Sequence, residues 1–164
     1  MSNESLNTSC LQARIAHECV SPRSAIKLLK YPALKSSIVE LEHHLLLGNT
    51  QFMERVCQKL MDQICLQLSI STMRVHVLDQ RPHDESSELH GLYEPVDQVR
   101  PRARIYVWMR TAKKQQIVAF KTFLLTLVHE LCHHLDYEYF KLEDSLHTPK
   151  FFQRESMIVK YLIG

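Results

Sequence analysis

The stretch His129-Glu130-Leu131-Cys132-His133 is the most informative part of this chain, and it lies inside the apolar segment 117–137. On an α-helix, residues four positions apart lie on the same face, one turn from each other. Two imidazoles with this spacing can bind one metal ion, while the intervening carboxylate stays near an open coordination position. The stretch therefore predicts a metal-binding helix that carries Glu130 as a general base.

The helix predicted for 117–137 has two different faces, since each residue turns the helix by about 100°. One face carries Phe120, Leu124, Leu127, Leu131 and Leu135, and the opposite face carries Thr122, Thr126, His129, His133, Asp136 and Phe140. Lys121 is the one charged residue between 117 and 128. We therefore expect a central helix that is buried on both sides. The alternative is that the two motif histidines are hydrogen-bonded core residues and bind no metal.

A third protein ligand is needed, because catalytic zinc usually takes three and leaves a fourth position to water. The candidates that follow the helix are Glu143, Asp144, His147 and Glu155. His147 is preferred because it stands directly before Thr148 and Pro149, where the start of a helix would hold its backbone rigidly. Glu155 is the alternative metal ligand, since a Glu on a second helix can complete the same geometry.

The side chains around the motif have less specific predictions. Asp136 lies one turn from His133 and is predicted to orient that imidazole. His134 points about 100° away and is predicted to lie on the helix surface, whereas Cys132 is predicted to be a small buried thiol. Four residues are unranked candidates for stabilising a tetrahedral oxyanion: His90, Tyr93, Arg154 and Tyr161.

The chain has 164 residues, of which 45% are hydrophobic, and this predicts one domain over 1–164 with its own core. The polar residues 1–9 are predicted to be flexible. Residues 20–69 are predicted to form a helical scaffold, with helices over 22–30, 36–47 and 52–68. Residues 73–164 are predicted to hold the strands, the metal site and a last helix over 149–163.

Alternating apolar and polar residues predict strands at 73–77 and, most clearly, at 102–110, with a further short strand at 89–93 and a loop over 80–88. In the clearest strand Ala103, Ile105, Val107 and Met109 share one face. We therefore expect an α+β fold resembling a small zincin. It has N-terminal helices, a short and mostly antiparallel three-stranded sheet packed on the central motif helix, and a C-terminal helix.

Composition limits the partners and the compartment. A formal net charge of +2 at pH 7 does not require a polyanionic partner. Five cysteines without a CxxC pair, and a polar N-terminus, predict a reduced, cytoplasmic protein. The apolar stretches are shorter than the roughly 18 residues that a bilayer requires, so no membrane partner is predicted.

Residues 127–152 resemble the SprT-like zinc metallopeptidases, which belong to the zincin superfamily. The resemblance rests on His129-Glu130-Leu131-Cys132-His133-His134 and, after a loop, on His147-Thr148-Pro149-Lys150-Phe151-Phe152. In that family the HExxH motif is followed by a third histidine and then by an aromatic residue in a helix. The resemblance implies an α+β zincin fold, Zn²⁺ as cofactor, Glu130 as base, and His129, His133 and His147 as metal ligands.

These patterns predict a metallopeptidase that cleaves a polypeptide substrate with a metal-activated water. The alternative is a catalytically silent, zinc-stabilised module that binds protein or nucleic acid. Nucleic-acid contact is suggested by basic residues interleaved with aromatic ones: Arg100, Arg102, Arg104, Tyr106, Trp108, Arg110, Lys113 and Lys114. An exposed strand face, or an edge that pairs with an extended peptide, gives the same pattern.

Overall fold

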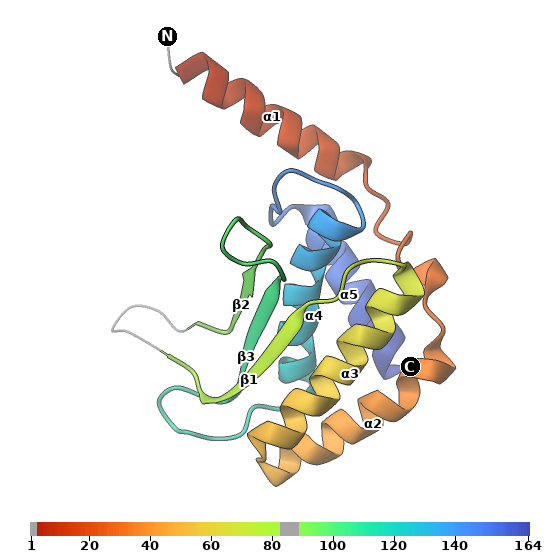
Figure 1. Ribbon diagram of the computed structural model, residues 1–164, viewed down its shortest axis with the longest axis vertical. Helices are drawn as coiled ribbons and strands as arrows, with labels where there is room; N and C mark the ends of the chain where they lie inside the picture. Colours follow the sequence, from red (N-terminus) through yellow and green to blue (C-terminus); the bar gives the residue numbers. More distant parts are fainter. Residues whose placement is uncertain (1–2, 83–88) are drawn as a thin grey trace.

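The computed structural model describes residues 3–82 and 89–164, with side chains from residue 11 onward. The elements follow in the order α1 (Asn3–Cys19), the 3-10 helix η1 (Ile26–Leu28), α2 (Tyr31–Leu47), α3 (Thr50–Leu68), β1 (Arg74–Gln80), β2 (Gly91–Glu94), β3 (Arg104–Arg110), α4 (Phe120–Glu138) and α5 (Pro149–Ile163) (Figure 1). The fold is therefore α+β, as the sequence predicts. Most of the predicted loop over 80–88 lies outside the described residues.

The three strands form a mixed sheet in the order β1-β3-β2. β3 pairs in parallel with β1, where Val75 lies beside Ile105, and antiparallel with β2, where Tyr93 lies beside Ile105. The prediction of a mostly antiparallel sheet is therefore wrong. β3 has the most consistently buried side chains of the three strands, so it occupies the centre. β2 follows β1 in the sequence, lies on the far edge and runs antiparallel to β3, so β3 has the same direction as β1.

Helices cover the sheet and enclose the core. α3 packs on β1, α4 packs on β2 and β3, and α2 and α5 lie outside α3 and α4 respectively (Figure 1). Between these elements the strand residues Val75, Ile105 and Val107 meet Leu127 and Leu131 of α4, and all five are buried. The prediction that the motif helix is a central, buried helix is confirmed.

Some helices begin and end where the capping residues in the sequence predict, and others do not. Gly48, with a φ of 66°, ends α2, and the Asn49 side chain accepts a hydrogen bond from the Phe52 N–H at the start of α3. The predicted helix over 22–30 is only the short η1. Pro32 lies in the first turn of α2, where backbone N–H groups have no carbonyl partner within the helix. Proline therefore costs no hydrogen bond at this position.

The N-terminal segment is helical from Asn3 to Cys19, and the flexibility of residues 1–9 stays a prediction. Adding residues to an existing helix is inexpensive, and the first break signals come at Ser21 and Pro22. Much of α1 projects from the body of the protein, and its C-terminal end lies near the segment between α4 and α5 (Figure 1). None of the described helices is long and apolar enough to cross a membrane.

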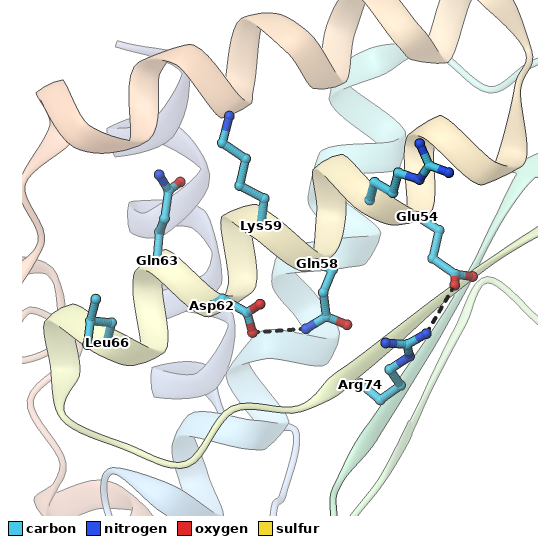
Figure 2. A pocket seen from close by; sticks show the side chains of 8 residues that line it. Glu54, Gln58, Lys59, Asp62, Gln63, Leu66 and Arg74 are labelled. Carbon is cyan, nitrogen blue, oxygen red and sulfur yellow. Dashed lines mark hydrogen bonds and ion pairs between the residues drawn. The ribbon is translucent and has the colours of Figure 1, made fainter.

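Side chains of α3 occupy the outer edge of β1. Gln58 accepts a hydrogen bond from the Val75 N–H and donates one to the Met73 carbonyl, both at 2.9 Å, while Glu54 accepts from the Val77 N–H at 3.1 Å. Figure 2 shows Glu54 and Gln58 on the rim of a surface hollow of about 490 Å³. Because these backbone groups are already paired, β1 is closed to a further strand. The other edge of the sheet is β2.

Candidate metal centre

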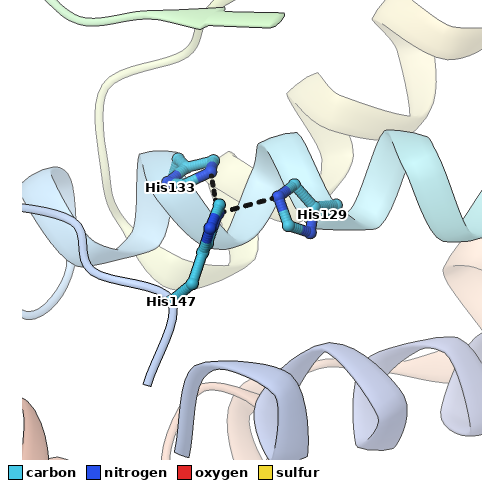
Figure 3. A group of neighbouring side chains, drawn as sticks. All are labelled: His129, His133 and His147. Carbon is cyan, nitrogen blue, oxygen red and sulfur yellow. Dashed lines mark hydrogen bonds between the residues drawn. The ribbon is translucent and has the colours of Figure 1, made fainter. Parts of the chain in front are cut away.

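The three histidines predicted as metal ligands come together in the structure. His129 and His133 project from α4, and His147 reaches them from the loop before α5 (Figure 3). The Nε2 atom of His147 lies 3.0 Å from that of His129 and 3.1 Å from that of His133. A tetrahedral zinc with Zn–N distances of about 2.0–2.1 Å has ligands about 3.3 Å apart. The group could therefore hold a metal ion.

The outer ring nitrogens of His129 and His133 indicate which nitrogen of each ring carries the hydrogen. His129 Nδ1 lies 2.6 Å from the Glu155 carboxylate, which can only accept, so Nδ1 carries the hydrogen. His133 Nδ1 lies 2.6 Å from Ser145 Oγ, whose own hydrogen is donated to Asp136. Both Nε2 atoms are therefore unprotonated in the neutral rings. Two unprotonated Nε2 atoms that face the ring of His147 fit a metal ion held between the three rings.

Glu155 holds the outer nitrogen of His129 and does not join the converging group. Its carboxylate contacts Nδ1, and the cluster of atoms close enough to share one ion consists of the three imidazoles. Carboxylates commonly orient metal-binding histidines in this way. The geometry thus favours Glu155 as an orienting residue over its predicted alternative role as a ligand.

Asp136 does not contact His133 directly. Ser145 lies between them and forms a hydrogen bond with each. Ser145 donates to Asp136 at 2.6 Å, and the other carboxylate oxygen of Asp136 accepts from Arg154. Asp136 and Arg154 are both almost completely buried, with exposed fractions of 0% and 1%. Sequence reasoning missed Ser145 because a serine in a loop has no distinctive pattern.

The environment keeps two of the three imidazoles neutral. Burial, followed by the charges of His129 and His147, lowers the pKa of His133 to about 3. Burial also lowers the pKa of His147. Burial acts in the same direction on His129, but its hydrogen bond to Glu155 and the nearby Glu130 carboxylate outweigh that effect and raise its pKa. Since a metal ion must compete with protons for each nitrogen, low pKa values favour metal binding at neutral pH.

Glu130 is buried against the backbone of β2. Its exposed fraction is 5%, and burial raises its pKa to about 7 against the opposing effect of His129. A Cβ atom added at Gly91 would lie 2.3 Å from Glu130 Oε1 and 2.9 Å from a methyl group of Thr126. Gly91 therefore leaves the space that the Glu130 carboxyl occupies. Sequence reasoning missed Gly91, although it is one of only three glycines in the chain.

Replacing Gly91 with Ala is expected to displace the Glu130 carboxyl while leaving the histidine group intact. A displacement of about 1 Å can lower a catalytic rate by about 100-fold. The measurement compares hydrolysis of unfolded casein and zinc content between the wild type and Gly91→Ala. Leu46→Ala, at an exposed position of α2 away from the sheet, is the control and should keep both properties. An unchanged rate in Gly91→Ala would show that this contact does not position Glu130.

Two other predictions near the motif have opposite outcomes. Cys132 is buried, as predicted. His134 is buried as well, so its predicted surface position is wrong. Its Nε2 lies 2.7 Å from the Ser71 carbonyl, and its Nδ1 lies 3.0 Å from the Tyr93 hydroxyl. The segment before β1 and the strand β2 cover this side of α4, which helical periodicity cannot reveal.

Three of the four oxyanion candidates have their polar groups engaged elsewhere. Arg154 pairs with Asp136, and the Tyr93 hydroxyl contacts His134. The Tyr161 hydroxyl donates to the Leu29 carbonyl and accepts from the Tyr31 N–H. His90 is exposed and stands directly before β2. The structure therefore does not support any of these three engaged groups as a hydrogen-bond donor to the oxyanion.

The basic and aromatic residues around β3 do not form one open face. Trp108 is buried, and the Tyr106 ring stacks on His76 at 4.9 Å. Arg100 pairs with Glu94 and Asp97, and Arg110 pairs with Asp79. Several of the cations are therefore balanced by carboxylates, and nucleic-acid contact remains a prediction.

Comparison with family models, with curated proteins and with solved structures found no match to this chain. Its site must therefore be interpreted from its own residues. They are three histidines that could hold a metal ion, a buried carboxyl within the same motif, and hydrogen bonds that fix two of the imidazoles.

Proposed function

We propose that this protein is a zinc-dependent metallopeptidase related to the SprT-like zincins. The observation that supports this most is the convergence of three Nε2 atoms from the HExxH helix and the following loop. Imidazole nitrogens suit zinc better than magnesium or calcium, which prefer oxygen ligands. Three protein ligands are also the usual number in catalytic zinc sites, where a coordination position stays open.

The residues of the chain would divide the chemistry as follows. Bound Zn²⁺ supplies a Lewis acid that polarises a carbonyl group and lowers the pKa of water toward about 7. Glu130 accepts a proton from the attacking water on its carboxylate and then donates it to the leaving amine. Both transfers require a group that can gain and lose a proton near neutral pH, and a carboxyl group can do this when its surroundings tune its pKa. Glu155 and Ser145 hold the rings of His129 and His133 in place.

The proposed substrate is an extended polypeptide segment that pairs with β2. This strand is an edge of the sheet, and its residue Gly91 lies against Glu130. An added strand would gain backbone hydrogen bonds while it passes close to the general base. The opposite edge, β1, is closed by Gln58 and Glu54. A peptide is thus directed to the edge that lies beside the motif.

The alternative of a catalytically silent zinc module requires a fourth ligand from the protein. Glu155 contacts the outer nitrogen of His129, and Cys132 is buried and interacts with Arg154. Within the part of the chain that the structure describes, the ion-binding group contains only the three histidines. This arrangement supports an open coordination position and therefore the enzyme over the silent module.

Metal analysis of histidine variants tests the proposal. The wild type should bind one zinc per chain and hydrolyse unfolded casein, with activity lost to a chelator and restored by zinc. His129→Ala, His133→Ala and His147→Ala should each weaken zinc binding by at least about 100-fold and abolish hydrolysis. His43→Ala is the control, because His43 is exposed on α2. Equal zinc affinity in His147→Ala and His43→Ala, or hydrolysis that survives metal removal, would contradict the proposal.

A further inference from the structure

A groove lies directly beside His147, between α1 and the start of α5. Its volume is about 470 Å³, and its walls are Arg14, Glu18, Leu146, His147, Thr148 and Pro149. His147 therefore belongs both to the group that could hold a metal ion and to the wall of the groove. A polypeptide bound at the metal has this groove next to it.

The wall that α1 contributes is fixed to the loop that carries His147. His17, in the last turn of α1, has an exposed fraction of only 2%. Its Nε2 lies 2.8 Å from the Asp144 carbonyl and 3.3 Å from the Leu146 N–H. His17 and Glu18 do not begin a second metal-binding motif, because Ser21 stands where its second histidine would be needed. The structure instead makes His17 the anchor of α1, so the groove has a defined shape.

The two charged side chains that line the groove, Arg14 and Glu18, differ in whether another side chain balances their charge. The Glu18 carboxylate lies 3.9 Å from Lys150 Nζ, which also donates to the Glu18 carbonyl, so its negative charge is balanced. Arg14 is exposed and makes no hydrogen bond or ion pair with any residue that the structure describes. The Thr148 hydroxyl is occupied by the Phe151 N–H. The uncompensated charge in this groove is therefore the guanidinium of Arg14, and it is positive.

We propose that this groove is a substrate subsite that accepts an acidic side chain of the bound polypeptide, with Arg14 as the residue that determines this specificity. The inference rests on the proposed function, since the groove is defined by its position beside His147. Arginine is suited to the role because its planar guanidinium binds a carboxylate through two parallel hydrogen bonds. A C-terminal carboxylate has the same chemistry, and the test separates the two sources.

Peptide binding to zinc-loaded Glu130→Gln protein tests the subsite without requiring cleavage. The probes are fluorescein-labelled decapeptides of Ala, Ser and Leu with amidated C-termini, carrying a single Glu, Gln or Lys at each position in turn. At one position the Glu peptide should bind about threefold more tightly than the Gln peptide, as expected for one exposed ion pair. The preference should shrink at high ionic strength.

Charge reversal identifies the residue responsible. Arg14→Glu, introduced into the same Glu130→Gln protein, should make the Lys peptide the tighter ligand at that position. Arg23→Glu is the matched control, because Arg23 is also exposed but does not line the groove, and it should keep the preference for Glu. Equal binding of Glu and Gln peptides, or equal behaviour of the two charge-reversal variants, would overturn the assignment. A matched peptide set with free C-termini is measured alongside, and a gain seen only for that set would overturn the side-chain assignment.

Cleavage of the same peptides by the wild type separates the two proposals. If the Arg14-dependent preference is present but the wild type cleaves none of the peptides, the subsite stands and the peptidase function fails. If the wild type cleaves Glu, Gln and Lys peptides at equal rates, the function stands and the subsite fails.

Discussion

Replacing Glu130 with Gln is expected to lower the hydrolysis of unfolded casein by about 1000-fold, the scale of general acid–base catalysis. Glutamine keeps the shape of the side chain but cannot accept a proton from water. Zinc content should stay at the wild-type level, because the group that could hold the ion consists of His129, His133 and His147. The measurement is the initial rate of casein hydrolysis together with zinc per chain.

Glu143→Gln is the matched control. It removes the same charge from an exposed position in the loop that carries His147, and it should keep the wild-type rate. Equal rates for Glu130→Gln and the wild type would remove Glu130 from the mechanism. A loss of zinc in Glu130→Gln would instead show that the carboxylate acts as a ligand.

The same variant should also change the pH dependence of stability in the metal-free protein. Burial raises the pKa of Glu130 from 4.5 to about 7 in the folded chain. Between these values the folded state holds a proton that the unfolded state has lost, so the free energy of unfolding falls as the pH rises. Glu130→Gln should lack this decline, which urea unfolding at pH 4.5 and pH 7 would detect as a difference from the wild type.

Replacing Asp136 with Ala is expected to destabilise the metal-free protein by about 3–5 kcal/mol, because it leaves the buried guanidinium of Arg154 without its carboxylate. It also removes the acceptor that fixes Ser145 beside His133. Loss of such an orienting partner typically weakens metal binding by about 10- to 100-fold. Urea unfolding and zinc titration against a competing chelator would measure the two effects.

Asp79→Ala provides the control for this prediction, since it breaks the ion pair with Arg110 at a side chain that is 62% exposed. Its cost should be below about 1 kcal/mol. If Asp136→Ala does not fold, Asp136→Asn keeps the shape and one oxygen acceptor, so it should cost less stability and still show the zinc effect. In the double variant Asp136→Leu with Arg154→Met, stability should recover while zinc affinity stays low. Equal costs for Asp136→Ala and Asp79→Ala would contradict the assignment.

The parts of the fold and site that the sequence predicts depend on local order. In any α-helix, residues four positions apart, such as His129 and His133, lie on the same face. The N-caps Asn49 and Thr148 likewise bond to backbone groups within the first turn of their helices. Alternation along β3 likewise predicts which side chains face the core. Each of these signals needs only the residues within one element.

Contacts between distant segments were decided by the tertiary structure. The position of β3 between β1 and β2 made the sheet mixed, and the strands beside α4 buried His134. Packing also placed Ser145 beside His133 and Gly91 beside Glu130.

The sequence by itself determined that a helix would present two imidazoles and a carboxylate together, because the geometry of an α-helix fixes the directions of residues within a few positions. Only the tertiary structure brought His147 within 3.0 Å of His129 and placed Gly91 against Glu130. Those approaches depend on how the loop and the sheet pack on α4, and packing is a property of the whole core.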